Sequence, residues 1–218
     1  MNYILNQLNS RISILRNIKS TKDLMVHYQS RLEFQLVLLL GYLWNLHIES
    51  LDDVDKENVY RMAQRPTIGD VVDMCRRLDA DNLFRKNKKL AQSLNSYPGL
   101  RNSFIGHGYT YADGQDAIIK QLDELYTAIV ESHIDILCDD IDFVYVDNLE
   151  NNCYKGICYK SNGSVISWSC PAEAGRFKLR NLYVTDKVNS YTCISPFIEI
   201  DNFGNGMFLY CRIEEKLL

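Results

Sequence analysis

The sequence predicts an α+β protein in which an all-α helical bundle is followed by a small antiparallel β-rich domain. Two observations support this class. Up to about residue 138, apolar residues recur every three or four positions, which is the spacing of one helix face. From about residue 142 the apolar residues alternate with polar ones, and Tyr, Phe, Val, Ile and Thr dominate. We therefore expect a bundle over residues 1–138 and a β domain over residues 142–218, separated at the acidic segment 139–142.

Five helices are expected in the bundle, at about residues 3–18, 25–46, 68–78, 83–95 and 118–137. The long second helix is interrupted in composition only by Gly41. Pro66 precedes the third helix, as is typical of a helix start, and the Pro98 and Gly99 pair is expected to end the fourth. The last helix has an apolar stripe formed by Ile118, Leu122, Leu125, Ile129 and Ile136. Because the connections are short, these helices should pack together as a bundle.

Six strands are expected in the β domain, at about residues 143–146, 154–160, 165–170, 177–184, 191–200 and 207–213. Turn residues connect them, notably the Asn162 and Gly163 pair and the glycine-containing segment 201–206. Regular short strands of this kind indicate an antiparallel meander. A domain of this size is marginally stable alone, so we expect the strands to pack against the bundle.

Composition excludes several classes of protein. A net charge of −4 over 218 residues argues against a generally basic nucleic-acid coat. The apolar run 36–44 is about half the length that spans a bilayer, so we expect a cytoplasmic protein without a membrane segment. Five of the seven cysteines lie after residue 150 without the spacing of a metal site, which favours buried reduced thiols. His27, His47 and His133 also lack a metal-ligand spacing, and no glycine-rich phosphate loop is present, so neither metal nor cofactor is expected.

The segment 101–109, with the sequence Arg-Asn-Ser-Phe-Ile-Gly-His-Gly-Tyr, concentrates groups that are suited to phosphodiester chemistry. Arg101 carries a permanent charge on a planar fork that binds phosphate, and His107 can take or give a proton near neutral pH. Asn102 adds an amide, and Tyr109 adds a phenol. These groups are sufficient to cleave a phosphodiester without metal, provided that the fold brings them together.

A locally basic segment precedes this motif. Its cations are Arg76, Arg77, Arg85, Lys86, Lys88, Lys89 and, at its end, Arg101. Only Asp79 and Asp81 oppose them. A basic stripe on an acidic protein is typical of a polyanion-binding surface, although a solvated helix face has the same composition.

A helical bundle that carries an Arg, a polar residue directly after it and a His four to six residues further on resembles a HEPN domain. Arg101, Asn102 and His107 match this pattern. The ending at 107–109 is similar to the His-x-Tyr ending of the HepT-like toxins in this superfamily. Those sequences usually have four residues between Arg and His, and this chain has five, with Gly106 as the extra one. The resemblance covers the bundle as an architecture and nine residues as a motif, and it does not extend to the β-rich part.

This resemblance implies a metal-independent endoribonuclease, commonly a toxin or antiviral effector, that acts as a homodimer. His107 would be the general base or acid, Arg101 would stabilise charge on the phosphoryl oxygens, and Asn102 would orient the His or the phosphate. The products would carry 2′,3′-cyclic phosphate and 5′-OH ends. The residues expected to contact RNA are Arg85, Lys86, Lys88, Lys89 and Tyr109.

Helix geometry adds a condition on assembly. Six residues of an ideal helix turn through about 600°, so Arg101 and His107 would lie about 120° apart on one regular helix. Either the turn unwinds at Gly106, or two chains pair so that their Arg and His residues share one cleft. A pair of chains would also supply two proton carriers, one for the 2′-OH and one for the leaving 5′-oxygen.

Other functions also fit the sequence. The chain could be a non-catalytic dimerisation or interaction module whose β domain senses a partner or ligand, with Arg101 paired to an acidic neighbour. It could also be a toxin whose Tyr109 is modified by a nucleotidyltransferase antitoxin, as the HepT-like resemblance implies. Glu33 in the second helix could face the motif and tune His107. Trp168 and the Tyr residues of the β domain could stack on bases, although such aromatic residues more often fill a small core.

Overall fold

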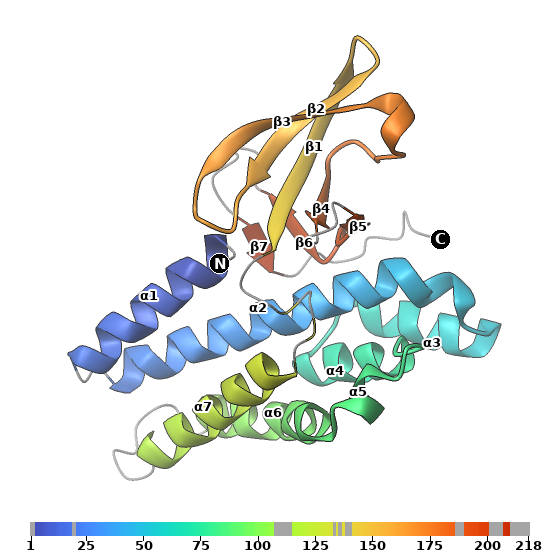
Figure 1. Ribbon diagram of the computed structural model, residues 1–218. Helices are drawn as coiled ribbons and strands as arrows, with labels where there is room; N and C mark the ends of the chain where they lie inside the picture. The colour runs from blue at the N-terminus through green and yellow to red at the C-terminus, as the bar shows by residue number, and fades with distance from the viewer. Residues whose placement is uncertain are drawn as a thin grey trace.

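The computed structural model describes residues 3–18, 21–106, 115–132, 134, 137, 141–185, 190–200 and 207–209. It confirms the α+β class, because helices occupy the first part of the chain and a five-stranded antiparallel sheet follows. Figure 1 shows the long helix α2 (Thr21–His47) running through the middle of the molecule, with the strands on one side and the later helices on the other. The expected packing of the strands against the helices is therefore present.

The other helices in the described part of the chain are short to medium in length. They are α1 (Tyr3–Asn17), α3 (Asp53–Gln64), α4 (Ile68–Arg77), α5 (Leu83–Lys86), α6 (Lys88–Gly106) and α7 (Gln115–Glu131). Short 3₁₀ turns follow α2, as η1 (Ile48–Ser50), and β3 (Val165–Pro171), as η3 (Ala172–Ala174). Local chemistry sets two of the helix starts. The Asp52 side chain caps α3 by accepting from the Asp55 N–H, and Thr67 and Asp70 form a reciprocal capping box on α4.

The helix prediction was wrong at four places. The helix expected at 83–95 is divided into α5 and α6 at Asn87, and the last helix, expected at 118–137, ends at Glu131.

Helix α3 was not expected, because its buried apolar positions are only Val59 and Ala63, while Val54 is 70% exposed. Helix α6 was expected to end before Pro98, but it continues through Pro98 and Gly99. Pro98 and Gly99 therefore lie inside a helix and do not end it.

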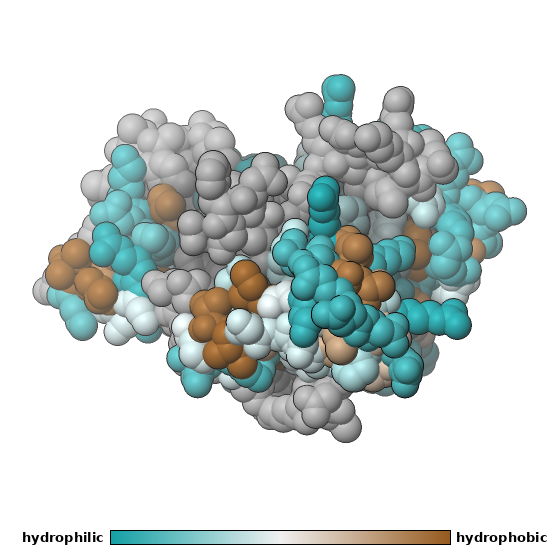
Figure 2. All heavy atoms as spheres, turned by 90° about the horizontal axis from the view of Figure 1, so that it is seen from above, coloured by the Kyte–Doolittle hydropathy of each residue, from teal (hydrophilic) through white to brown (hydrophobic). Residues whose placement is uncertain are grey.

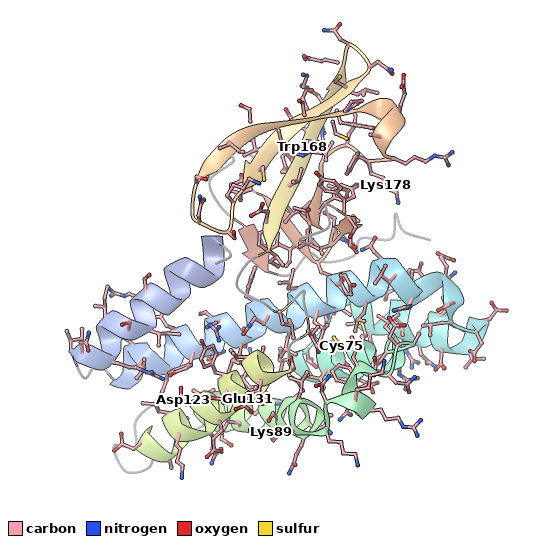
Figure 3. The ribbon with its side chains drawn as sticks, in the orientation of Figure 1. Cys75, Lys89, Asp123, Glu131, Trp168 and Lys178 are labelled. Carbon is pink, nitrogen blue, oxygen red and sulfur yellow. The ribbon has the colours of Figure 1, made fainter. Side chains whose placement is uncertain are left out.

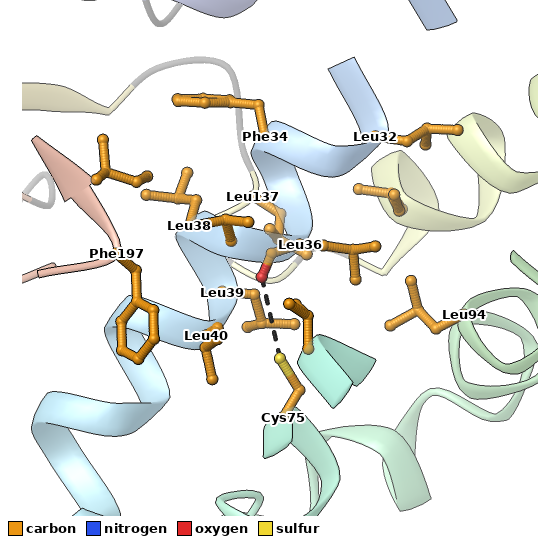
Figure 4. Packing of buried hydrophobic residues seen from close by; sticks show 14 of the residues in the cluster. Leu32, Phe34, Leu36, Leu38, Leu39, Leu40, Cys75, Leu94, Leu137 and Phe197 are labelled. Atoms are coloured by element: carbon orange, nitrogen blue, oxygen red, sulfur yellow. Dashed lines mark hydrogen bonds between the residues drawn. The ribbon is translucent and has the colours of Figure 1, made fainter. Parts of the chain in front are cut away.

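Helix α2 is buried on every side in its middle. The consecutive residues Leu36, Val37, Leu38, Leu39 and Leu40 are each at most 2% exposed. Figure 4 shows how side chains from several elements surround them. The Cys75 thiol of α4 donates to the Leu36 carbonyl, with 3.9 Å between sulfur and oxygen. A helix that is apolar all round is the expected centre of a layered core.

The five-stranded sheet has the order β3-β2-β1-β4-β5, and all its neighbouring strands are antiparallel. Its strands are β1 (Asp142–Glu150), β2 (Cys153–Tyr159), β3 (Val165–Pro171), β4 (Asn181–Thr185) and β5 (Tyr191–Cys193). The first three strands form the expected meander. The meander prediction fails at β4, which returns across the sheet to pair with the free edge of β1. The strands β6 (Ile198–Ile200) and β7 (Met207–Leu209) form a separate antiparallel pair.

Two expected strands differ from the observed ones. The residues 177–184 were expected to be extended throughout, but β4 begins at Asn181, because the preceding residues cross from β3 to β4. The residues 191–200 were expected as one strand and form two, β5 and β6, interrupted around Pro196. Pro196 has no N–H to donate, and the neighbouring Ser195 hydroxyl accepts from the Leu182 N–H at 2.9 Å.

The sheet has an inner and an outer face. Inward-facing residues such as Phe143, Leu182 and Val184 belong to the same apolar core as α2. On the opposite face, Val144 and Tyr183 belong to a second, smaller cluster. The main core therefore extends across the boundary that the sequence pattern suggested between helices and strands.

None of the described helices is both long and apolar enough to cross a membrane. Figure 2, which looks down on the molecule from the side of the sheet, shows groups of hydrophilic side chains with smaller hydrophobic patches between them.

Candidate functional site

The candidate site lies near the C-terminal end of α6. Arg101 and Asn102 lie on this helix, which continues without a break from the residues before Pro98. Asn102 is exposed, and Arg101 is partly buried, with 29% of its side chain exposed. His107 and Tyr109 lie outside the described residues. The structure therefore places half of the motif, and it places that half on a continuous helix and not at a bend.

Arg101 is held by Glu33 of α2. Its Nε donates to Glu33 Oε1 at 3.0 Å, and the Glu33 side chain is 12% exposed. The same carboxylate oxygen accepts from Gln29 Nε2 at 3.0 Å, one helical turn earlier on α2. The Tyr97 hydroxyl of α6 donates to the Gln29 carbonyl at 3.5 Å. Two residues of α6 thus contact a polar patch on α2 that consists of Gln29 and Glu33.

This geometry determines what Arg101 can still bind. The Nε atom is used by Glu33, while the two Nη groups make no hydrogen bond within the described ranges. A guanidinium held at Nε keeps its Nη groups available for an anion. The Glu33 carboxylate lowers the net positive charge at this position and fixes the direction of the side chain. Glu33 was named as a residue that could face the motif and tune His107; it contacts Arg101, and His107 lies outside the described residues.

The basic segment is not gathered around Arg101. Arg85, Lys86 and Lys88 are exposed and form no ion pair with other described residues. Lys89 pairs with Glu131 of α7 at 2.6 Å, and Figure 3 shows the two side chains together. At 1.5 Å per residue, Lys88 lies about 20 Å along α6 from Arg101 and about 220° around it. The described residues expected to contact RNA, Arg85, Lys86, Lys88 and Lys89, therefore lie toward the other end of α6 and on α5, away from Arg101.

Other members of the basic segment take part in local ion pairs. Arg77 contacts Asp73 at 3.1 Å and Asp55 at 2.6 Å, which links α4 to α3. Beside them is an open hollow of about 480 Å³ lined by Asn58, Arg61, Met62, Arg65, Asp70, Asp73 and Arg77. Sequence analysis missed this hollow because α3 was not predicted. The acidic N-cap and first turn of α3 are the signal that could have revealed it.

Burial disfavours the thiolate form of four of the described cysteines. The described cysteines Cys75, Cys153, Cys158, Cys170 and Cys193 are free thiols, as expected. Burial raises the pKa of the Cys75 thiol, and it also raises the pKa of Cys158, Cys170 and Cys193. Only Cys75 and Cys158 of the described five are fully buried, so the expectation of buried thiols holds for part of the set. Within the described ranges, no group of three or more His, Cys, Asp or Glu residues is arranged to hold a metal ion.

The two described histidines have structural surroundings. Burial lowers the pKa of His27, and the nearby Arg11 charge lowers it further. His47, at the end of α2, lies 3.2 Å from Asp81 between His Nε2 and Asp Oδ2. Neither residue approaches Arg101 through a hydrogen bond or ion pair in the described part of the chain.

Comparisons of this chain with protein-family models, with curated proteins and with solved structures find no match.

Proposed function

We propose that this protein is a metal-independent endoribonuclease of the HEPN type. The observation that carries the proposal is the state of Arg101, which projects from α6 in a helical bundle and is oriented by Glu33 through Nε alone. Its Nη groups are the part of a guanidinium that binds a phosphate in a bidentate manner. Asn102 follows it as an exposed amide, and His107 is six residues further along the chain.

In the proposed reaction the 2′-OH of one nucleotide attacks the adjacent phosphorus, and the 5′-oxygen of the next nucleotide leaves. His107 takes the proton of the 2′-OH or gives a proton to the leaving oxygen. Arg101 stabilises the negative charge that accumulates on the phosphoryl oxygens. Asn102 orients the phosphate or the imidazole. The products carry 2′,3′-cyclic phosphate and 5′-OH ends, and DNA is inert because it lacks the nucleophile.

A homodimer fits this chemistry better than a single chain. Because α6 is helical through Gly106, the arithmetic of about 100° per residue applies from Arg101 up to the residue before His107. Two chains that pair along this end of α6 would place an Arg from each and a His from each around one scissile phosphate. Such a nuclease, acting on cellular or foreign RNA, has the properties of a toxin or an antiviral effector.

The test is cleavage of a fluorescently labelled RNA in EDTA by the wild type, His107→Ala and Arg101→Ala. We expect each variant to lose about 100-fold or more in rate, because each removes a group that acts in the transition state. Arg11→Ala, which removes an exposed cation from α1, is the matched control and should cleave like the wild type. Equal cleavage by His107→Ala and the wild type, or a strict requirement for added metal, would reject the proposal.

A second function is favoured by the same ion pair. If Arg101 serves only to join α6 to α2, the protein is a non-catalytic interaction module. Arg101→Ala would then lower the free energy of unfolding by about 1–2 kcal/mol, the scale of a partly buried charged hydrogen bond. The wild type would cleave no RNA. Glu33→Gln separates the two functions, because it keeps the shape of the contact and removes the charge that orients Arg101. A drop in cleavage without a matching loss of stability would support the nuclease.

A further inference from the structure

The outer face of the five-stranded sheet carries a box of aromatic side chains with a fifth ring at its centre. The central ring is Phe177, and each wall comes from a different strand of β2 to β5. The ring centroids of Tyr154, Trp168, Tyr183 and Tyr191 lie 5.2, 5.2, 5.0 and 5.2 Å from that of Phe177. Each wall is inclined to the Phe177 ring by 72–81°. Phe177 therefore occupies the space that a flat aromatic ligand of similar size would fill.

The central ring belongs to the crossing segment, which is the chain between β3 and β4 at residues 172–180. At one end of this segment the Ala172 N–H donates to the Asn152 carbonyl at 2.9 Å. At the other end the Arg180 N–H donates to the Val146 carbonyl at 2.6 Å. Between these anchors, the Lys178 N–H donates to the Tyr183 hydroxyl at 2.7 Å. The Phe177 side chain is thus a main attachment of an otherwise exposed crossing segment.

The charges beside the box show which ligand it suits. Arg176, Lys178 and Arg180 flank Phe177 in sequence, are exposed, and make no ion pair with other described residues. Figure 3 shows Lys178 in the sheet layer with Trp168, away from α6 and α7. One acidic residue, Glu173, lies on the same segment. An aromatic box alone suits either a cation or a nucleobase. Three exposed cations on the segment that carries Phe177 repel a cation and attract phosphate, so they favour a nucleobase with its phosphates.

We propose that this box is a nucleobase pocket for single-stranded RNA, closed in the free protein by Phe177. A base enters by displacing the Phe177 ring and packs against Trp168 and the tyrosines. Arg176, Lys178 and Arg180 contact the phosphates on either side. That the bound RNA is also a substrate rests on the proposed nuclease function. The pocket itself is inferred only from the arrangement of aromatic side chains on the sheet.

Two substitutions open the pocket by different means. Phe177→Ala removes the ring, and Gly175→Ala crowds it, because a Cβ at Gly175 would lie 2.7 Å from Phe177 Cε2. The probe is a labelled 12-nucleotide oligouridine with 2′-O-methyl riboses, which cannot be cleaved by a 2′-OH mechanism. Fluorescence anisotropy should show binding about three-fold or more tighter for both variants, because apparent affinity rises as the open fraction rises. The same oligonucleotide without bases should show no gain.

The phosphate contacts are tested by replacing Arg176, Lys178 and Arg180 with Gln together. We expect binding about ten-fold weaker at low salt and a log–log salt dependence that is shallower by about 2, because three phosphate contacts are lost. The matched control replaces three other exposed cations, Arg11, Arg61 and Lys120, with Gln. The control should keep most of the affinity.

Several results would overturn the proposal. One is unchanged or weaker binding by folded Phe177→Ala and Gly175→Ala proteins, as judged by thermal melting. If Phe177→Ala does not fold, the Gly175→Ala result decides alone. If the triple variant and its control lose the same amount of RNA affinity, Arg176, Lys178 and Arg180 do not contact the phosphates specifically. If uridine monophosphate competes for binding as strongly as the oligonucleotide does, the ligand is a single nucleotide and not single-stranded RNA. If these variants change RNA binding as expected but the wild type cleaves no RNA, the pocket is supported and the nuclease function is rejected. If the wild type cleaves RNA but the variants do not change binding, the nuclease function is supported and the pocket is rejected.

Discussion

Tyr28 joins three helices through its hydroxyl group. Its ring lies in the core, and its hydroxyl donates to Asp123 of α7 at 2.7 Å and also contacts Arg16 of α1. Burial, together with the hydrogen bond to Asp123, raises the pKa of Tyr28 from 10.0 to about 12. The neutral phenol is therefore the form that the folded state prefers. Its contribution to stability is complete below pH 10 and is lost as the pH rises toward 12.

We predict that the free energy of unfolding falls between pH 10 and 12, and that part of this fall disappears in Tyr28→Phe. The phenylalanine variant keeps the ring in the core and removes the group that titrates. Denaturant unfolding at a series of alkaline pH values measures the difference between the two proteins. If the two stability curves remain parallel across this range, Tyr28 does not titrate in the way described.

At the scale of elements, α2 and the connection between β5 and β6 approach each other closely at Gly41. A Cβ placed at Gly41 would lie 2.6 Å from the Ile194 carbonyl oxygen, which belongs to the connection between β5 and β6. Gly99 of α6 is the opposite case, because it is exposed and a Cβ there would meet nothing within 4 Å. Packing against Ile194 therefore requires a glycine at position 41, whereas the packing at position 99 would admit a larger residue.

We predict opposite effects for the same substitution at these two positions. Gly41→Ala should lower the free energy of unfolding by about 1–3 kcal/mol, because backbone must move to admit the methyl group. Gly99→Ala should raise it by about 0.5–1 kcal/mol, because alanine favours the helix and clashes with nothing. Urea unfolding of the two variants checks both signs. A stabilised Gly41→Ala protein would show that α2 and the β5–β6 connection are less tightly packed than the structure indicates.

The elements show where sequence patterns suffice and where they fail. The long helix α2 and the first three strands could be predicted, because burial on one face or all round imposes a regular spacing of apolar residues. Helix α3 has too narrow a buried stripe to reveal itself in this way. Pro98 illustrates the opposite error, because a strong local signal for a helix end is overridden by the packing of α6 against α7.

The candidate site, like the fold, could be predicted from the sequence only in part. The motif pointed to Arg101 and Asn102, but the sequence pattern ended the preceding helix before Pro98, so their place on the continuous helix α6 was not predicted. The partner of Arg101 could be named only as one possibility, since the contact with Glu33 joins residues 68 positions apart in the chain. Residues 177–180 of the crossing segment were mistaken for part of a strand, because the alternating basic and apolar residues at 176–180 imitate a strand pattern.

At the scale of the whole molecule, helices and strands share one core. Phe34 of α2 packs edge-on against Phe143 of β1, with 6.2 Å between ring centroids. Trp44 lies between Tyr60 of α3 and Phe197, at 5.2 and 5.1 Å. Neither layer can keep these side chains buried without the other. The predicted domain boundary therefore separates two sequence patterns, but the helices and strands that they form depend on each other for stability.

We predict that the two layers unfold in a single cooperative transition. The two tryptophans allow a direct test, since Trp44 lies in α2 and Trp168 in the sheet. Trp168→Phe leaves a reporter for the helical layer, and Trp44→Phe leaves one for the sheet. In each variant the fluorescence midpoint should coincide with the midpoint of the helical circular dichroism signal. A sheet that melts at a lower denaturant concentration than the helices would contradict the shared core.

The burial of α2 on all sides has a consequence during synthesis. Leu36 to Leu40 leave the ribosome before the residues that cover their strand-facing side, which extend to Ile198. About 160 residues must be added in between, which takes roughly 8 to 30 seconds at typical elongation rates. Throughout that interval the nascent chain exposes its most apolar helix. We therefore expect α2 to be prone to aggregation until the strands are synthesised and close the core.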